Sequence, residues 1–170
     1  IIAAVKRGHQ ALDSITSGGI TLGTEQSTTS GTVKTFSSIP AGTKRITILF
    51  VGVSTGASND IEVRLGDSGG IESTGYTSIG FLIFGSIPAS TSSTTGFIID
   101  APSGGHDYHG HMVFCLEDST ANTWTCSHTA YGDTTQVHLG GGSKSLSAEL
   151  TQLSLNTTAF DAGAVNINYE

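Results

Sequence analysis

The densest group of potential metal ligands is one short segment, His106-Asp107-Tyr108-His109-Gly110-His111. In an extended chain alternate side chains point the same way, so His109 and His111 would share a face and His106 could fold back toward them. A zinc or nickel site needs three or four such ligands with supporting hydrogen bonds. The spacing matches no fixed motif. We therefore interpret the segment as a polar loop entering a strand, and we expect no metal and no cofactor. Two alternatives stay open, a metal on a trimer axis and a pH-sensitive contact.

A second chemical motif is Gly66-Asp67-Ser68-Gly69-Gly70, which matches the sequence around the nucleophilic serine of trypsin-like proteases. That chemistry requires a histidine base, an orienting aspartate and an oxyanion hole. The only histidine before the motif is His9, in a terminal segment, and the 65 preceding residues are too few for the first barrel of such a protease. We interpret the motif as a turn. No carboxylate pair stands out for acid and base catalysis, so we assign no catalytic residue and expect the protein not to be an enzyme.

Four aromatic residues, Tyr76, Tyr108, Trp124 and Tyr131, are the ones we expect to be most exposed. An aromatic ring can stack on the apolar face of a sugar while its polar group stays wet. Tyr108, Trp124 and Tyr131 are therefore candidates for contact with a host-surface glycan. The alternative for Trp124 is that its ring covers the sheet.

The two cysteines, Cys115 and Cys126, lie on either side of a predicted hairpin turn, Ser119–Asn122. If the hairpin is centred between Thr120 and Ala121, facing residues have numbers that sum to 241, as 115 and 126 do. Facing residues have Cβ atoms at a separation that a disulfide can bridge. A cross-strand disulfide and two free thiols are the two alternatives.

The elements that must position these side chains are strands. The clearest is Ile39–Val53, where a turn at Pro40 and Gly42 leads into a run rich in β-branched residues. Both of its faces are largely apolar, so we expect a central strand covered on both sides. Shorter strands are expected at Ile20–Thr24, Thr32–Phe36, Ile61–Leu65, Ser78–Phe84, Gly96–Asp100, His111–Glu117, Thr123–Ala130, Val137–Gly142, Leu146–Leu155 and Ala164–Tyr169.

Regular strand and turn signals predict an all-β fold, a β-sandwich or jelly roll of about ten strands spanning residues 19–170. We expect recognition to lie in two loops, Gly85–Thr95 and Ala101–Gly110. Residues 1–18 form a separate N-terminal arm or linker. Its apolar and basic residues favour docking on a neighbouring subunit or scaffold, with a mobile tail as the alternative. The residues of this docking arm are Ile1, Ile2, Val5, Lys6 and Arg7.

Composition limits the partners. The 170 residues suit one domain, and charged residues make up only 12% of the chain with a net charge of −7. Basic residues adjoin only at Lys6-Arg7 and Lys44-Arg45, so we expect no nucleic-acid binding. No apolar run approaches 18 residues, so we expect no membrane-spanning helix. Because the chain begins at Ile1, we expect it to be part of a longer or processed protein.

Several segments form a recognisable pattern when they are taken in order. They are Ile39-Pro40, Lys44–Ile48, Gly52–Thr55, Leu65–Glu72, Thr74–Tyr76, Gly110-His111, Thr120–Trp124 and above all Phe160–Glu170, with the pattern Phe-Asp-Ala-Gly-x-x-Asn-Ile-x-Tyr-Glu. Together they resemble a family of small virion structural proteins encoded by tailed bacteriophages and prophages. The resemblance covers about residues 20–170 and leaves out the arm and the histidine-rich loop. It implies a structural role in the virion and places the Asp-Ser-Gly-Gly segment in a structural turn.

The resemblance implies two structural functions. The first is a non-catalytic homotrimeric β-knob at a tail fibre or spike, which attaches the virion to its host. The second is a capsid decoration or cement protein, whose arm would dock on capsomers. Both imply other virion proteins as partners and assembly in the host cytoplasm. A glycan-cleaving or peptide-cleaving enzyme is a third hypothesis, from another class, which the lack of a paired acid and base disfavours.

Overall fold

The computed structural model describes residues 19–56, 59–85, 87–100, 105–132 and 135–170. Within these ranges the chain is all-β and contains no helix, so no described helix is long and apolar enough to cross a bilayer. The predicted docking arm lies outside the described residues, namely Ile1, Ile2, Val5, Lys6 and Arg7.

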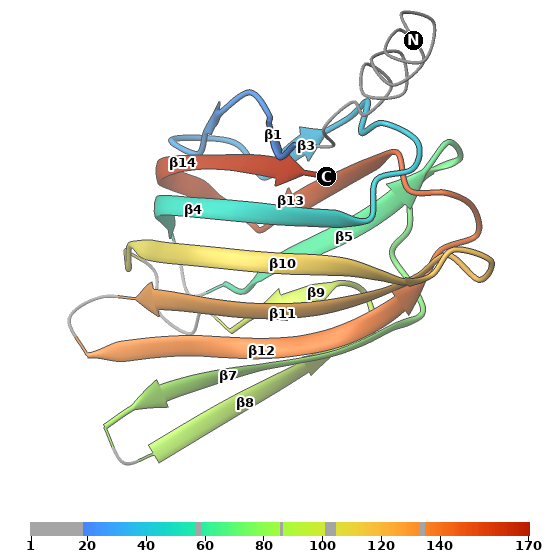
Figure 1. Ribbon diagram of the computed structural model, residues 1–170. Coiled ribbons are helices and arrows are strands. Elements are labelled where there is room, and N and C mark those ends of the chain that lie inside the picture. Colours follow the sequence, from blue (N-terminus) through green and yellow to red (C-terminus); the bar gives the residue numbers. More distant parts are fainter. Residues whose placement is uncertain (1–18, 57–58, 86, 101–104, 133–134) are drawn as a thin grey trace, which may run out of the picture.

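In the described part of the chain fourteen strands form two antiparallel sheets, as the predicted all-β sandwich requires (Figure 1). The narrower jelly-roll topology stays a prediction. The large sheet has the order β1-β14-β4-β10-β11-β12-β7-β8, with β2 also pairing with β14. Its strands are β1 (Thr21–Leu22), β2 (Gln26–Ser27), β4 (Arg45–Thr55), β7 (Tyr76–Phe84), β8 (Ile87–Ser93), β10 (Tyr108–Asp118), β11 (Thr123–Gly132), β12 (Gln136–Ser145) and β14 (Phe160–Tyr169).

The small sheet has the order β3-β13-β5-β6, and β9 pairs with β5. It lies behind the large sheet in Figure 1. Its strands are β3 (Val33–Phe36), β5 (Ile61–Asp67), β6 (Gly70–Ile71), β9 (Phe97–Ile99) and β13 (Gln152–Asn156).

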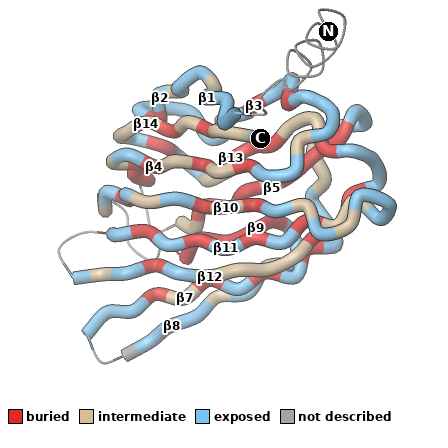
Figure 2. The backbone as a smooth tube through the Cα atoms, viewed as in Figure 1, coloured by how far each residue is buried: buried red, intermediate tan, exposed pale blue. Residues whose placement is uncertain are grey.

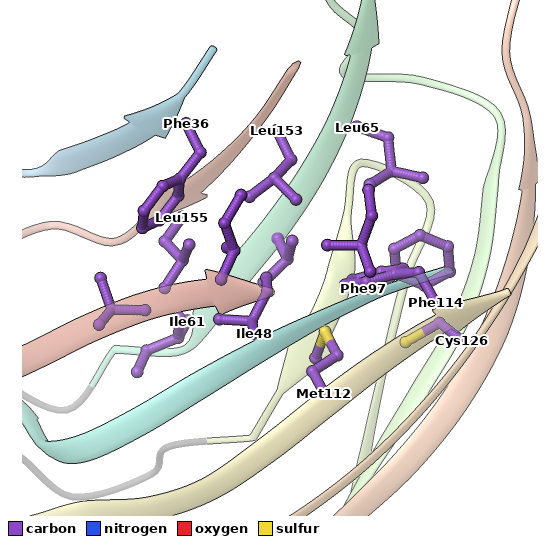
Figure 3. Close-up of a cluster of buried hydrophobic side chains, with 14 of the residues drawn as sticks. Phe36, Ile48, Ile61, Leu65, Phe97, Met112, Phe114, Cys126, Leu153 and Leu155 are labelled. Carbon is purple, nitrogen blue, oxygen red and sulfur yellow. The ribbon is translucent and has the colours of Figure 1, made fainter. Parts of the chain in front are cut away.

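The core lies between the sheets (Figure 3). Ile48, Met112 and Phe114 of the large sheet meet Leu65 and Leu153 of the small sheet, and all five side chains are fully buried. Burying a side chain of this size contributes about 1.5–3 kcal/mol. This apolar layer holds the sandwich together and fixes which face of each strand points inward.

The strand predicted to be central is central, because β4 lies between β14 and β10. Its inward residues, Ile46, Ile48 and Phe50, are buried. The expectation that the second face is also covered is wrong, since the side chain of Val51 on that face is 61% exposed. The small sheet covers only one face of the large sheet and leaves the other open (Figure 2).

Strands β4 and β14 approach each other unusually closely. Gly163 has a φ of 86°, in the left-handed region that favours glycine. A Cβ atom at Gly163 would collide with the backbone of Gly52 and Val53. The pairing of the two strands also shifts register between Ala162 and Ala164. The glycine is therefore needed both for its own conformation and for the contact.

Several predicted boundaries are wrong. Strand β10 begins at Tyr108, inside the segment Ala101–Gly110 that was expected to be a loop. The segment Gly85–Thr95, expected to be a loop, contains β8, which pairs with β7 along the edge of the large sheet. Its Ser and Thr side chains suit an edge strand with little burial, and Pro88 is tolerated at an edge. The strand expected at Leu146–Leu155 begins only at Gln152, because Leu146 and Leu150 are buried in a loop instead.

Candidate functional site

The Asp-Ser-Gly-Gly segment forms the tight turn between β5 and β6, as predicted. The Asp67 carboxylate is buried and accepts hydrogen bonds from the Ser147 hydroxyl (2.6 Å) and the Gly69 N–H (2.7 Å). These donors, with the Ser147 hydroxyl foremost, hold the pKa of Asp67 below its usual value of 3.8. The Asp67 carboxylate therefore stabilises the turn and holds the segment around Ser147 against it.

The histidine-rich segment leads into β10. His109 and His111 lie exposed on one face of that strand, as expected from their spacing. His106 is partly buried, with its Nδ1 atom 3.1 Å from Oε1 of Gln136. His109 Nδ1 accepts a hydrogen bond from the Gly52 N–H at 3.2 Å. Among the described residues no group of three or more His, Cys, Asp or Glu side chains is placed to hold a metal ion.

The expectation of exposed aromatic residues is wrong for three of the four. Tyr76, Tyr108 and Trp124 are buried, because their strand positions point into the sandwich. A ring must be exposed to stack on a sugar, and Tyr108 and Trp124 lack the exposure that the glycan prediction requires. Only Tyr131 is exposed, on the outer face of β11.

The predicted facing of Cys115 and Cys126 is wrong by one residue. Next to the turn Asp118 pairs with Thr123, a sum of 241, but a β-bulge follows and the pairing then sums to 240. A bulge adds one residue to one strand and shifts all later pairs. Cys115 therefore faces Thr125 and is exposed, whereas Cys126 faces Phe114 and is buried. Both thiols are free.

The structure brings together a carboxyl pair that the sequence did not reveal. Ile61 pairs with Ile99, so Asp60 and Asp100 come next in the same antiparallel register. Asp100 is only 6% exposed, and it is hydrogen-bonded to Asp60 and to the Thr91 hydroxyl. Burial, and then the charge of Asp60, raise the pKa of Asp100. The two residues are 40 apart in sequence, so no local motif could have indicated the pair.

This pair is too close for hydrolysis of a glycan by two carboxyls. Glycosidases hold their carboxyl groups roughly 5 Å apart or more, so that the sugar or a water fits between them. Hydrogen-bonded carboxyls leave no such space. Asp60 does border an open groove of about 410 Å³, but the ion pair of Glu62 and Arg64 (2.7 Å) also lines it. The pair is best suited to sharing a proton.

Two further buried histidines were also missed. His138 is fully buried, edge-on to Tyr108 with ring centroids 4.9 Å apart, and His128 is buried nearby. Burial, with a smaller effect of the charge of His138, lowers the pKa of His128 to about 4. Both positions lie on the inner face of a strand, and their place could have been found from strand alternation once the register was known.

The most extensive feature without a partner is the outer face of the large sheet. We define the outer face as the outward-pointing residues of β11, β12, β7 and β8. Figure 2 shows exposed residues alternating with buried ones along β11. The described members of the outer face are Thr123, Thr125, Ser127, Thr129, Tyr131, Val137, Leu139, Gly141, Ser143, Ser145, Thr77, Ile79, Phe81, Ile83, Pro88, Ser90 and Ser92.

None of these described members carries a charge, and the apolar ones gather at the end of the sheet where β11 ends and β12 begins. Tyr131 faces Val137, which faces Ile83, and in the next row Leu139 faces Phe81. A surface with apolar side chains and no charge is typical of the centre of a protein interface. The outer face is therefore the candidate functional site.

Comparison with models of known protein families finds none that matches this chain, and a search of curated proteins finds no similar sequence.

Proposed function

We propose that the chain is a non-catalytic structural protein of a tailed-phage virion, a homotrimeric β-knob at a tail fibre or spike that contacts the host. The observation that carries this proposal is the uncharged outer face formed by β11, β12, β7 and β8, which suits assembly with another protein. Tyr108 and Trp124 carry no host contact in this proposal, because both are buried.

The positions of the phage-like segments support a structural role. The ending Phe160–Glu170 supplies β14, and the segment Lys44–Ile48 opens β4, its neighbour in the sheet. The Arg45 guanidinium lies 3.4 Å from the Glu170 carboxylate, and Lys44 N–H donates to the Glu170 carbonyl at 2.8 Å. The segments that carry the resemblance therefore build scaffold together.

Immunogold electron microscopy of the phage particle tests this function. An antibody raised against the sandwich should label the tail fibre or spike. Labelling of the head would favour the alternative, a capsid decoration protein whose N-terminal arm docks on capsomers. Labelling of no part of the particle would overturn the virion assignment altogether.

The enzymatic hypothesis would need the carboxyl pair of Asp60 and Asp100, which are hydrogen-bonded and too close for glycan hydrolysis, although Asp60 borders the open groove. Incubation with host polysaccharide should release no reducing ends from the wild-type protein. Release that is abolished by Asp100→Asn, while the variant stays folded, would replace the structural proposal with a glycan-cleaving one.

A further inference from the structure

We propose that a second copy of this chain packs against the outer face of the large sheet and buries Tyr131, Val137, Leu139 and Ile83. The inference deepens the proposed function. It rests on the self-association that the function includes and does not depend on where in the virion the protein lies.

The first argument is the cross-strand arrangement of the apolar side chains. One row runs from Tyr131 through Val137 to Ile83, and the next holds Leu139 and Phe81. Four of these five side chains are 36–48% exposed, although residues of their type are normally buried. They adjoin across three strands, so they form a continuous patch rather than isolated exposed residues. Continuous patches of this kind mark contact surfaces.

The second argument is charge. The whole chain has a net charge of −7, so two copies repel each other over most of their surfaces. On the described outer face there is no Asp, Glu, Lys or Arg side chain to desolvate. Two copies can therefore approach there without burying an unpaired charge, which would otherwise be costly.

The third argument is area. Four strands spaced about 4.8 Å apart, with up to ten residues rising about 3.3 Å each, present roughly 600 Å² before side-chain relief is counted. A stable interface buries about 800 Å² on each partner. The outer face alone therefore approaches what one copy must contribute to a lasting contact. In a trimer, a face turned toward the threefold axis is shared by two neighbours.

The chemistry of the face favours a second copy over other occupants. A strongly charged partner would find no opposite charge on it, and an anionic membrane surface would find no Lys or Arg. Around the apolar patch the face carries hydroxyl groups, such as those of Thr125, Ser127 and Ser143. Hydroxyls both donate and accept hydrogen bonds, so a face of this kind can match another copy of itself.

Sedimentation velocity on the full 170-residue chain tests the inference with two matched variants. Val137 on the outer face and Val33 on β3 are both strand valines, 42% and 49% exposed. We expect the wild type to sediment as a trimer of the 17.4 kDa chain. Val137→Lys should sediment as a monomer, because three ammonium groups would meet in the contact, and Val33→Lys should remain a trimer.

Leu139→Ser is a second test that adds no charge. We expect it to lower the association constant at least tenfold, as measured from the dependence of the average mass on protein concentration. Far-UV circular dichroism checks that each variant is folded. If Val137→Lys does not fold, the result for Leu139→Ser alone decides whether the inference holds. A monomeric wild type at high concentration would overturn the inference without changing the virion assignment. A trimer that persists in both outer-face variants would also overturn it, as would equal dissociation of Val33→Lys.

Discussion

At the scale of single residues, one β-bulge determines which face of the hairpin each cysteine side chain occupies. The bulge between Leu116 and Asp118 turns Cys115 outward and leaves Cys126 in the core. Burial raises the pKa of the Cys126 thiol, and a buried neutral thiol is chemically inert. The sequence places the hairpin correctly, but a single inserted residue cannot be read from spacing alone.

Titration with a thiol reagent should therefore detect one reactive thiol per native chain and two after unfolding in denaturant. Cys115→Ser should abolish the reaction of the native chain with the reagent. It should leave the reaction seen after unfolding, because Cys126 becomes accessible only when the chain unfolds. Detection of no thiol in the unfolded, unreduced protein would show that the two cysteines form a disulfide.

The buried His128 predicts how stability depends on pH. Its pKa is about 4 in the folded chain, against 6.5 for an ordinary histidine, so the unfolded chain binds the extra proton first. Stability should be complete above pH 6.5 and fall as the pH drops toward 4. At about 1.4 kcal/mol for each pKa unit, the loss is roughly 3 kcal/mol.

His128→Gln cannot titrate, so its free energy of unfolding should lose about 3 kcal/mol less than the wild type between pH 7 and pH 4. Urea denaturation at a series of pH values measures this difference. The matched control is His111→Gln, the same substitution at an exposed strand position. Parallel pH curves for wild type and His128→Gln would contradict the account.

At the scale of elements, two glycines with the same backbone conformation separate local strain from close strand packing. Gly163 has a φ of 86° and faces the backbone of Gly52, whereas Gly42 has a φ of 83° and open space around it. Gly42→Ala should cost about 1 kcal/mol of left-handed strain. Gly163→Ala should cost about 2 kcal/mol more, because β4 and β14 must also move apart.

Thermal or urea unfolding of the two variants measures these costs. A closely similar loss in both would mean that the approach of β14 to β4 does not contribute to stability.

Strand positions were predicted well where hydrophobic residues alternate with polar ones, as in the two segments that form β4 and β5. The Ser-rich β8 was missed because its side chains bury little, and only its pairing with β7 makes it a strand. The pairing of Asp60 with Asp100 was missed because it depends on the register of β5 with β9. Local pattern indicates strands, whereas contacts between distant strands follow from the packed fold.

At the scale of the whole molecule, the large sheet has one face covered by the small sheet and one face that the small sheet does not cover. The core fills one face of the large sheet, whereas many residues that point to the other face are exposed (Figure 2). The exposed Val51 on the second face of β4 lies outside the outer face, which is formed by β11, β12, β7 and β8. The buried Lys144, paired with Glu72 and donating to the Ser145 carbonyl at 2.7 Å, shows that charge is kept off the outer face by strand alternation.

A cryo-electron microscopy reconstruction of the intact particle tests the central claim most directly. The account predicts the sandwich at the tip of a tail fibre or spike, with Tyr131, Val137 and Ile83 of each copy buried against neighbouring copies. Density for the sandwich on the head, or copies whose outer faces are open to solvent, would contradict it.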